Sequence, residues 1–426
     1  MGSFDASQKQ KYNFFEETFY GIELPLIPAL AHLELSGIAI DSGALSEISN
    51  EFNFRLEELS QTIFGLAGSS FNINSVVELQ TVLYQKLGLH TAAGIRPKKI
   101  KLGNQMSTDE ETLEKMSAFP LPQKILDYRL LNKLQNTYLE QLPTFVHPKT
   151  KRIHASFQQM VAATGRLSSE NPNLQNIPIR TEEGRRIRKA FIPSRPDHLL
   201  VSADYSQIEL RIVAHYSKDP TFLKAYREHQ DIHALTASAI FGVEVSQVTR
   251  EMRSAAKEVN FGLIYRMGAD RLAIVTKRTK AEAKLFIEKF FQRYYTIHAL
   301  QEQFIEQARK EGFALTLMGR RRYLPEINGK GLAKSLAEGA AVNTPIQGSA
   351  AEVIKMAMIS IDRRLRQEKL TANMVLSVHD ELVFDVPESE VPRLCEVVRE
   401  EMENVIVLEV PLTIEIGKAK NWLDAH

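Results

Sequence analysis

Two aspartates stand where short apolar segments end, a position from which carboxylates can share divalent metal ions. Residues 199–201 predict a short buried strand that leads to Asp204, and two β-rich runs, 374–378 and 382–386, predict a hairpin with Asp380 at its tip. Side by side in one sheet, the two side chains would face the same groove. Such oxygen ligands suit Mg²⁺, which keeps other positions for water and phosphate, and paired ions assist phosphoryl transfer. The alternative for either aspartate alone is a turn residue at a strand end.

A second candidate site is a helix with cations along its first half and aromatic rings along its second. Arg253, Lys257, Phe261 and Tyr265 recur at every fourth position, which predicts one slowly drifting stripe. A nucleoside triphosphate has an anionic end and a flat end, and it matches this order of charge and ring. The helix N-terminus adds a favourable potential for phosphate. The alternative is a partly buried amphipathic helix without a ligand.

Other patterns typical of phosphate and metal sites are missing. The run 329–331, Gly-Lys-Gly, lacks the earlier glycine and the following hydroxyl residue of a phosphate-binding loop. No His-Glu-x-x-His or paired-cysteine spacing occurs, which excludes the usual zinc sites. Cys395 is the one cysteine, so an internal disulfide is impossible and a reducing cytosol fits.

Length and composition describe an ordinary globular protein. The 426 residues are enough for roughly three lobes, and contents of 44% hydrophobic and 25% charged residues exclude disordered and fibrous classes. The most apolar stretch, 22–40, is interrupted by prolines and charged side chains, so we expect no membrane span. No basic flank precedes an apolar run at the N-terminus, so we expect no secretory signal and a cytoplasmic location.

The net charge of +1 means that a nucleic-acid surface would need positive charge gathered on one face. Three clusters are candidates for this charge: residues 96–101, 185–189 and 320–322. Each of them is alternatively a solvated loop. Composition alone therefore does not decide for or against nucleic acid.

Periodicity and capping patterns place helices around the candidate residues. Helical periodicity dominates 25–138 and 220–311. Ser/Thr-x-x-Glu capping boxes predict three helix starts, at Thr108 with Glu111, at Ser206 with Glu209 and at Thr279 with Glu282. The second of these would follow Asp204 directly, which gives strand, carboxylate and helix in that order.

These segments together resemble the motifs of family A DNA polymerases, the bacterial DNA polymerase I type. The matching segments are 204–211 (DYSQIELR, motif A), 253–265 (motif B), 378–381 (VHDE, motif C), 164–169 (TGRLSS), 173–178 (NLQNIP) and 344–348 (TPIQG). All occur in the family's order, and the similarity runs from about Ile22 to the C-terminus. The resemblance implies a template-directed DNA polymerase that extends a primer 3′-hydroxyl with dNTPs and releases pyrophosphate.

The family implies an α+β right-hand polymerase fold, with an antiparallel palm sheet and helical fingers and thumb. The expected divisions are a lead-in stub at 1–21, thumb and palm entry at 22–165, palm at 166–216 and 348–426, and fingers at 217–347. The family's 3′–5′ exonuclease domain would precede the thumb, where only the stub stands. We therefore expect no proofreading activity from this chain.

Positions within the motifs imply catalytic roles. Asp204 and Asp380, assisted by the Tyr205 carbonyl, would bind two Mg²⁺ ions, with Mn²⁺ as an alternative metal. Glu381 would support the primer end. Lys257 would protonate the departing pyrophosphate, because a cation at that point stabilises developing negative charge.

The resemblance also assigns residues to the nucleotide and to the duplex. Those implied at the incoming nucleotide are Gln207, Glu209, His233, Arg253, Lys257, Phe261 and Tyr265. Those implied at the primer–template are Arg166, Asn176, Arg180, Arg266, Asn343, Gln347 and His379. Glu209 would crowd a ribose 2′-hydroxyl and favour deoxynucleotides, although a capping role beside Ser206 is an equal alternative. Primer–template DNA and dNTPs are the implied partners of a monomeric chain, with no membrane.

Two positions depart from the family pattern. Arg266 stands where glycine normally follows the motif B tyrosine, and Gly339 stands where the family carries a DNA-facing arginine. One position gains a cation and the other loses one, so our hypothesis is that Arg266 replaces the lost charge near the templating strand. The alternatives are that Arg266 points into solvent while Gly339 weakens DNA binding, or that the bulk of Arg266 hinders closure of the fingers.

Two other functions compete with a DNA polymerase. A single-subunit RNA polymerase shares the palm chemistry, and Glu209 together with the Gln347 segment argues against it. A catalytically silent DNA-binding protein or structural subunit is the other candidate. Retention of both aspartates and of the complete cation–aromatic stripe argues against this second class.

Overall fold

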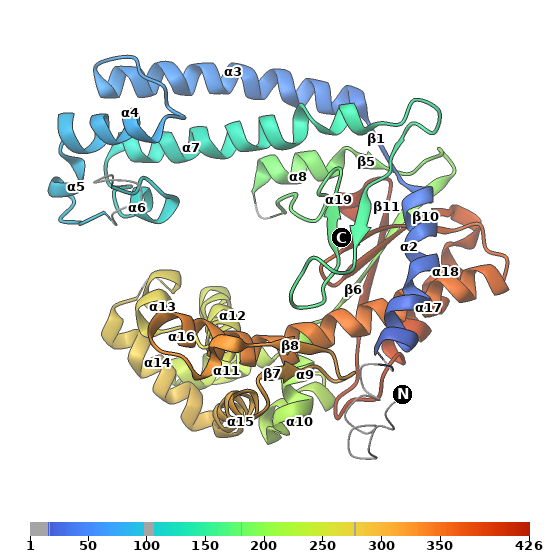
Figure 1. Cartoon of the computed structure of the whole chain (residues 1–426). Coiled ribbons are helices and arrows are strands. Elements are labelled where there is room, and N and C mark those ends of the chain that lie inside the picture. Colours follow the sequence, from blue (N-terminus) through green and yellow to red (C-terminus); the bar gives the residue numbers. More distant parts are fainter. Residues whose placement is uncertain (1–15, 17, 98–105, 180, 277) are drawn as a thin grey trace, which may run out of the picture.

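The computed structural model describes residues 16, 18–97, 106–179, 181–276 and 278–426. Most of the predicted lead-in (1–21), part of the basic cluster 96–101, and Arg180 therefore lie outside the described residues. Two sets of helices extend in the same direction from a sheet-bearing centre, so that in Figure 1 both arms lie to the left of the sheet with a gap between their ribbons.

A four-stranded antiparallel sheet forms the centre, in the order β11-β6-β10-β9. Its strands are β6 (His198–Tyr205), β9 (Asn373–Val378), β10 (Glu381–Pro387) and β11 (Ile414–Ala419). The predicted strand at 199–201 and the predicted hairpin over 374–386 are thereby confirmed. Every residue of β10 before Pro387 is buried, as expected for a short, nearly continuous apolar run in the middle of a sheet.

Helices and short strands pack around this sheet. The helices are α2 (Leu24–Ser36), α8 (Glu182–Lys189), α9 (Ile208–Ser217), α17 (Ser349–Gln367), α18 (Val391–Glu403) and α19 (Trp422–Ala425). A second antiparallel sheet contains β1 (Ile38–Ile40), β2 (Arg152–Ile153) and β5 (Phe191–Ile192), and β3 (Ser156–Gln158) pairs with β4 (Ser168–Glu170). The π-helical turn η1 (Phe19–Glu23) precedes α2.

The first helical arm is the long pair α3 (Ser42–Ala67) and α7 (Pro120–Leu134) (Figure 1). The elements at its tip are α4 (Val76–Gln80), η2 (Thr81–Lys86), α5 (Leu89–Ala92) and α6 (Glu110–Glu114). The turns η3 (Gln135–Leu139) and η4 (Leu142–Phe145) lead from α7 back to the centre. Helix α3 stops where Gly68 takes a left-handed φ of +67°, a common way to end a helix.

The second arm contains the segment between α9 and α17. Its elements are α10 (Pro220–Arg227), α11 (Ile232–Phe241), η5 (Val245–Gln247), α12 (Arg250–Ile264), α13 (Ala269–Val275), α14 (Lys280–Arg293), α15 (Tyr295–Glu311), β7 (Phe313–Leu315), β8 (Arg321–Tyr323), η6 (Pro325–Asn328), α16 (Gly331–Asn343) and η7 (Thr344–Gly348). Within the described ranges, no helix combines the length and apolarity needed to cross a bilayer.

Buried apolar side chains of the described residues form three clusters. One surrounds the central sheet, one fills the second arm, and one fills the tip of the first arm. Helix α9 is shared between two of them: Ile208 and Ile212 belong to the sheet cluster, while Leu210 and Val213 belong to the second-arm cluster. Because α9 directly follows β6, this double packing ties the strand that carries Asp204 to the second arm.

Hydrogen bonds at two helix starts test the predicted capping boxes. Thr279 and Glu282 form the predicted box at α14. At α6 the cap is Asp109, whose side chain accepts a hydrogen bond from the Thr112 N–H at 3.0 Å, so the predicted cap at Thr108 is wrong by one residue. An aspartate caps a helix as well as a threonine does. Where two capping residues are adjacent, the backbone conformation decides which of them is the cap.

Two of the predicted basic clusters contribute partly to the interior. Arg188 is 4% exposed and donates to the Ile177 carbonyl at 3.0 Å. Arg320 pairs with Glu23, and its side chain is 18% exposed. Arg320 therefore neutralises an internal carboxylate and Arg188 donates to a buried carbonyl, so both add little to a free positive surface.

Arg266 is held in a left-handed conformation just after α12. Its φ is +61°, and its N–H donates to the Leu263 carbonyl at 3.1 Å while the Met267 N–H donates to the Gly262 carbonyl at 2.7 Å. Glycine takes this conformation without the steric cost that a Cβ brings. The backbone thus explains why glycine is the family's usual residue at this position.

We expect Arg266→Gly to raise the melting temperature, because a left-handed residue with a side chain costs about 1 kcal/mol. The ion pairs lost, to Glu302 at 3.4 Å and to Glu338 at 3.5 Å, are long, so they offset little of the gain. Calorimetry of Arg266→Gly beside Arg266→Ala checks this, since alanine loses the ion pairs and keeps the strain. A glycine variant no more stable than the alanine variant would contradict the prediction.

Candidate active site

Asp204 and Asp380 lie on neighbouring segments of the central sheet. Asp204 is opposite Glu381 of β10 in the strand register, and the Tyr205 N–H donates to the Asp380 carbonyl at 3.2 Å. Asp380 stands in the short turn between β9 and β10, directly after His379, which has a φ of +52°. The structure therefore brings together the two carboxylates that the sequence placed at separate strand ends.

Burial and mutual repulsion leave both carboxyl groups short of compensating charge. Burial first, and then the charges of Asp380 and Glu381, raise the pKa of Asp204 to about 7. Burial also raises the pKa of Asp380, and the Arg166 guanidinium opposes this rise from 3.9 Å away. Ionised carboxylates in such a place are stabilised by an added cation.

The donor set fits a divalent metal ion with open coordination positions. In the part of the chain that the structure describes, no group of three or more His, Cys, Asp or Glu side chains is arranged to hold a metal. Asp204 and Asp380 are thus a carboxylate pair, with the Tyr205 carbonyl on the same strand end as a further oxygen. Mg²⁺ commonly binds through one or two carboxylates and fills its other positions with water and substrate phosphate.

Glu381 lies in the interior behind this pair. It is 3% exposed and accepts hydrogen bonds from Ser202 Oγ at 2.6 Å and Trp422 Nε1 at 2.9 Å, with His426 Nδ1 at 3.3 Å. Burial opposes ionisation, and the hydrogen bonds from His426 and Ser202 hold its pKa below the ordinary value. Sequence reasoning missed these three partners, because Trp422 and His426 approach from the C-terminal helix, far along the chain.

Arg166, Glu209 and Tyr265 connect the sheet to the second arm. Arg166 Nη2 lies 2.6 Å from Glu209 Oε1 and 3.9 Å from Asp380 Oδ1, and the Tyr265 hydroxyl donates to Glu209 Oε2. Burial raises the pKa of Glu209, against the hydrogen bond from Tyr265 and the charge of Arg166. Gln347 adds a side-chain hydrogen bond to Tyr265. Side chains from two other segments thus bind the Glu209 carboxylate, and Gln347 is connected to it through Tyr265.

The predicted capping box at the start of α9 is wrong. The N-cap is Gln207, with a φ of +55° and no side-chain capping bond, and its Oε1 accepts a hydrogen bond from the Tyr226 hydroxyl at 3.0 Å. Glu209 is turned toward Arg166 and Tyr265, and these charged and phenolic donors outcompete the Ser206 backbone. Of the two roles left open for Glu209, the capping role is therefore excluded.

The cation–aromatic stripe lies on one helix, α12, with Tyr265 at its C-terminal end. Arg253 and Lys257 are exposed, and Phe261 and Tyr265 are half-buried. Arg253 Nε lies 2.5 Å from Asp231 Oδ2. Asp231 was not singled out from the sequence, although its position as the cap of α11 is a readable signal.

His233 lies in the interior beside the stripe. It is 1% exposed, its Nδ1 is 2.9 Å from Asn260 Nδ2, and its ring centre is 6.0 Å from that of Phe261. Burial lowers its pKa to about 4. The imidazole is therefore neutral near pH 7, so it can form hydrogen bonds but carries no charge.

The remaining predicted residues surround this centre to different degrees. His379 and Asn176 are exposed, and Gln347 and Asn343 are half-buried. Arg266 makes ion pairs with Glu302 and Glu338. Gly339, which follows Glu338 in the sequence, faces open space, because an added Cβ there would meet no atom within 4 Å. Arg180 lies outside the described residues.

An antiparallel sheet that carries a carboxylate pair, set between two helical arms, is the architecture of a right-hand polymerase. The chain matches the profile described as DNA polymerase family A over residues 42–424. It therefore belongs to DNA polymerase family A.

Known proteins of this family are similar along nearly the whole chain. The chain is 45% identical to DNA polymerase I of Geobacillus stearothermophilus over 406 residues, covering 95% of this chain and 46% of that protein. It is 45% identical to DNA polymerase I of Pseudomonas aeruginosa (95% and 44% covered) and 44% identical to the thermostable DNA polymerase I of Thermus thermophilus (95% and 48%). The chain thus spans about half the length of the curated relatives it matches.

A solved structure has the same fold. It is the POL domain of Pol1 from M. smegmatis in complex with DNA primer-template and dNTP, with a TM-score of 0.89 and 40% identity, covering 95% of this chain and 70% of that one. The expected α+β right-hand polymerase fold is confirmed by this likeness.

We expect Asp204→Asn to stabilise the metal-free protein at about pH 8. A carboxyl group whose pKa rises from 3.8 to about 7 on folding has its stabilising contribution below 3.8 and loses it as pH rises through about 7. The ionised wild type then carries the full cost above pH 7, and the amide avoids it.

Melting curves with a chelator at about pH 8 and about pH 5 check this, with the larger gain expected at the higher pH. Asp270→Asn is the matched control, because the Asp270 side chain is 79% exposed and lies on α13. An Asp204→Asn variant that melts no higher than wild type at the higher pH would refute the prediction.

Proposed function

We propose that this chain is a template-directed DNA polymerase that extends a primer 3′-hydroxyl with dNTPs and releases pyrophosphate. The observation that carries the proposal is one continuous set of contacts, from the carboxylate pair through Arg166 and Glu209 to Tyr265 on the stripe helix. This set joins a place suited to metal ions with a place suited to a nucleotide. A silent DNA-binding protein needs neither the paired carboxylates nor their link to α12.

Asp204 and Asp380 are the proposed metal ligands, with the Tyr205 carbonyl as a third oxygen. Two divalent ions, Mg²⁺ with Mn²⁺ as an alternative, supply activation of the attacking hydroxyl and stabilisation of the leaving oxygen when they are bound. The two carboxylates would hold these ions where the end of β6 meets the turn between β9 and β10. Glu381, fixed from behind by Ser202 and Trp422, acts in this proposal by keeping negative charge close to Asp204.

The stripe helix is the proposed nucleotide site. Arg253 and Lys257, both exposed, would bind the triphosphate through charge-assisted hydrogen bonds. Lys257 would give a proton to the departing pyrophosphate. Phe261 and Tyr265 would pack against sugar and base, with His233 behind the Phe261 ring as a neutral hydrogen-bonding partner. Arg253 must exchange its contact with Asp231 for phosphate.

Glu209 is the proposed sugar selector. Its carboxylate is held on both oxygens, by Arg166 on one and Tyr265 on the other, so it has little freedom to move aside. A ribose 2′-hydroxyl placed against a fixed, buried carboxylate meets steric crowding. Gln207, the N-cap of α9 two residues before Glu209, is held by Tyr226, and it would further limit the space for a 2′-hydroxyl.

The primer–template would lie along the arms, with the first arm as thumb, the second as fingers and the sheet as palm. Its proposed contacts are Arg166, Asn176, Arg180, Arg266, Asn343, Gln347 and His379. We further propose that the chain acts as a monomer in the bacterial cytosol. Binding to primer–template should weaken steeply with salt, because phosphate contacts release counterions.

Asp204→Asn and Asp380→Asn should each abolish extension of a labelled primer while retaining primer–template binding. Loss of more than about 100-fold in rate is expected, because each amide removes a metal-binding charge. Asp270→Asn is the control and should extend like wild type. Full extension by either active-site variant would remove the catalytic assignment, and a wild type that extends no primer with any dNTP would remove the proposed function.

Glu209→Ala should relax the choice between dNTP and rNTP. Removing the carboxylate opens space at the sugar, so the ratio of kcat/KM for dNTP to that for rNTP should fall by at least about tenfold. Single-nucleotide insertion with dATP and ATP on a matched template measures it. An unchanged ratio would exclude Glu209 as the selector.

A further inference from the structure

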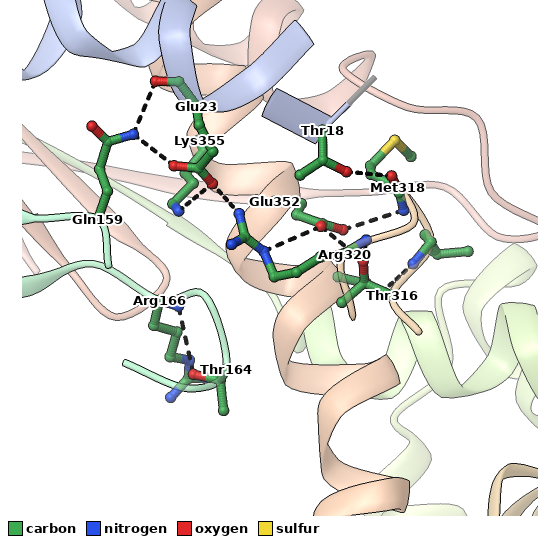
Figure 2. A network of polar contacts seen from close by, with 12 residues as sticks. Thr18, Glu23, Gln159, Thr164, Arg166, Thr316, Met318, Arg320, Glu352 and Lys355 are labelled. Carbon is green, nitrogen blue, oxygen red and sulfur yellow. Dashed lines mark hydrogen bonds and ion pairs between the residues drawn. The ribbon is translucent and has the colours of Figure 1, made fainter. Parts of the chain in front are cut away.

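A network of buried charges and polar side chains joins four segments of the chain: η1, the segment at Gln159, the turn between β7 and β8, and α17 (Figure 2). Glu23, at the end of η1, accepts a hydrogen bond from Lys355 Nζ on α17 at 2.8 Å and pairs with Arg320. Gln159 Nε2 donates to the other Glu23 oxygen at 2.6 Å. Lys355 and Glu352 of α17 are each 1% exposed. The network is therefore part of the interior and is not a set of surface ion pairs.

Glu352 fastens the turn between β7 and β8 to α17. Its carboxylate accepts hydrogen bonds from Thr316 Oγ1 at 2.7 Å and from the Met318 N–H at 3.2 Å, and Arg320 Nε lies 3.6 Å away. The Arg320 N–H donates in turn to Thr316 Oγ1 at 2.9 Å. Arg320 thus lies between Glu23 and Glu352 and has little freedom of its own.

The Arg320 side chain packs directly against the backbone of Gly165. A Cβ at Gly165, whose φ is +83°, would stand 2.6 Å from Arg320 Nε and 2.9 Å from its Cδ. On the other side, a Cβ at Gly348 would stand 3.1 Å from the Thr164 carbonyl oxygen and 2.5 Å from Thr316 Cγ2. The segment 164–165 is thereby confined between Arg320 and η7, and neither Gly165 nor Gly348 has space for a side chain.

The residue that follows this confined segment is Arg166, which bridges Glu209 and Asp380. Arg166 and Lys355 also line one small cavity together with Asp380. The charge network therefore reaches the active site along two routes, the backbone at Gly165 and the wall formed by α17.

We propose that Arg320 is a positioning residue for Arg166. Held between Glu23 and Glu352, its guanidinium fixes the backbone at Gly165, and this directs Arg166 toward Glu209 and Asp380. The inference rests on the proposed polymerase function, and it adds that the turn η1 before α2, through Glu23, controls the geometry of sugar selection. Removing one partner of such a cluster leaves an uncompensated buried charge, so the members act as a unit.

A double-mutant cycle between Arg320→Lys and Arg166→Ala tests the proposal. Lysine keeps the charge and loses the planar fork that both holds two carboxylates and covers Gly165. Single-turnover insertion on a primer–template should show kcat/KM for dATP falling about fivefold for Arg320→Lys in the wild-type background, and less than about twofold in the Arg166→Ala background. The ratio of dATP to ATP insertion should fall in Arg320→Lys as it does in Arg166→Ala, because both loosen Glu209.

Arg364→Lys is the matched control. Like Arg320, Arg364 binds more than one carboxylate, here Glu368, Glu400 and Glu401. It lies on α17, near the end of that helix far from Gly348 and Gly165. Its effect should be the same in both backgrounds, and it should leave the dATP to ATP ratio unchanged.

Glu23→Gln provides a second route if Arg320→Lys does not fold, since the amide is isosteric and removes the charge that holds both Arg320 and Lys355. Equal losses for Arg320→Lys, or for Glu23→Gln, with and without Arg166 would overturn the proposal, as would an unchanged dATP to ATP ratio. A wild-type chain that inserts no nucleotide would instead overturn the proposed function, so the two failures are distinguishable.

Discussion

The proximity of two carboxylates at the end of one sheet is the constraint on which the other features depend. Asp204 and Asp380 are brought together in a largely buried place, and the raised pKa of Asp204 reflects first the cost of burial and then the repulsion from Asp380 and Glu381. The antiparallel ladder between β6 and β10 holds them in place, supported by strands buried on both faces. The folded protein therefore carries the electrostatic cost of two buried, closely placed carboxylates before any metal binds. A bound divalent cation would lower this cost.

Cations and hydrogen-bond donors surround the two carboxylates without fully compensating their negative charge. Arg166 divides its charge between Glu209 and Asp380 and lies closer to Glu209. Arg188 stacks over the Trp422 ring at 4.1 Å, and its Nη1 is 4.0 Å from Glu381. Farther out, Arg320 and Lys355 neutralise Glu23 and Glu352. A chain with a net charge of +1 can therefore have a strongly polarised interior, because its charges are used in pairs at specified places.

Local patterns were sufficient for the secondary elements that matter most. The apolar runs on either side of Asp380 are short and flank polar residues, which is why the hairpin was predictable. The stripe from Arg253 to Tyr265 follows helical spacing, so its helix was predictable too. The caps show the limit of such patterns: Asp109 and Thr108 are both good capping residues, and only the backbone path selects one. At Glu209 a capping interpretation fails because Arg166 and Tyr265, distant in sequence, are stronger partners.

What the sequence by itself determined is the inventory: which strands and helices form, which residues carry acid, cation or ring, and the family to which their order belongs. Only the tertiary structure decided which of them meet. Glu381 binds Ser202 and Trp422 in the interior. His233 is buried as a neutral imidazole, and Arg320, part of a basic cluster in the sequence, lies against Gly165. The physical reason is that hydrophobic periodicity and capping act over a few residues, whereas burial, charge compensation and close packing depend on neighbours that lie far apart in the sequence, such as Ser202 and Glu381.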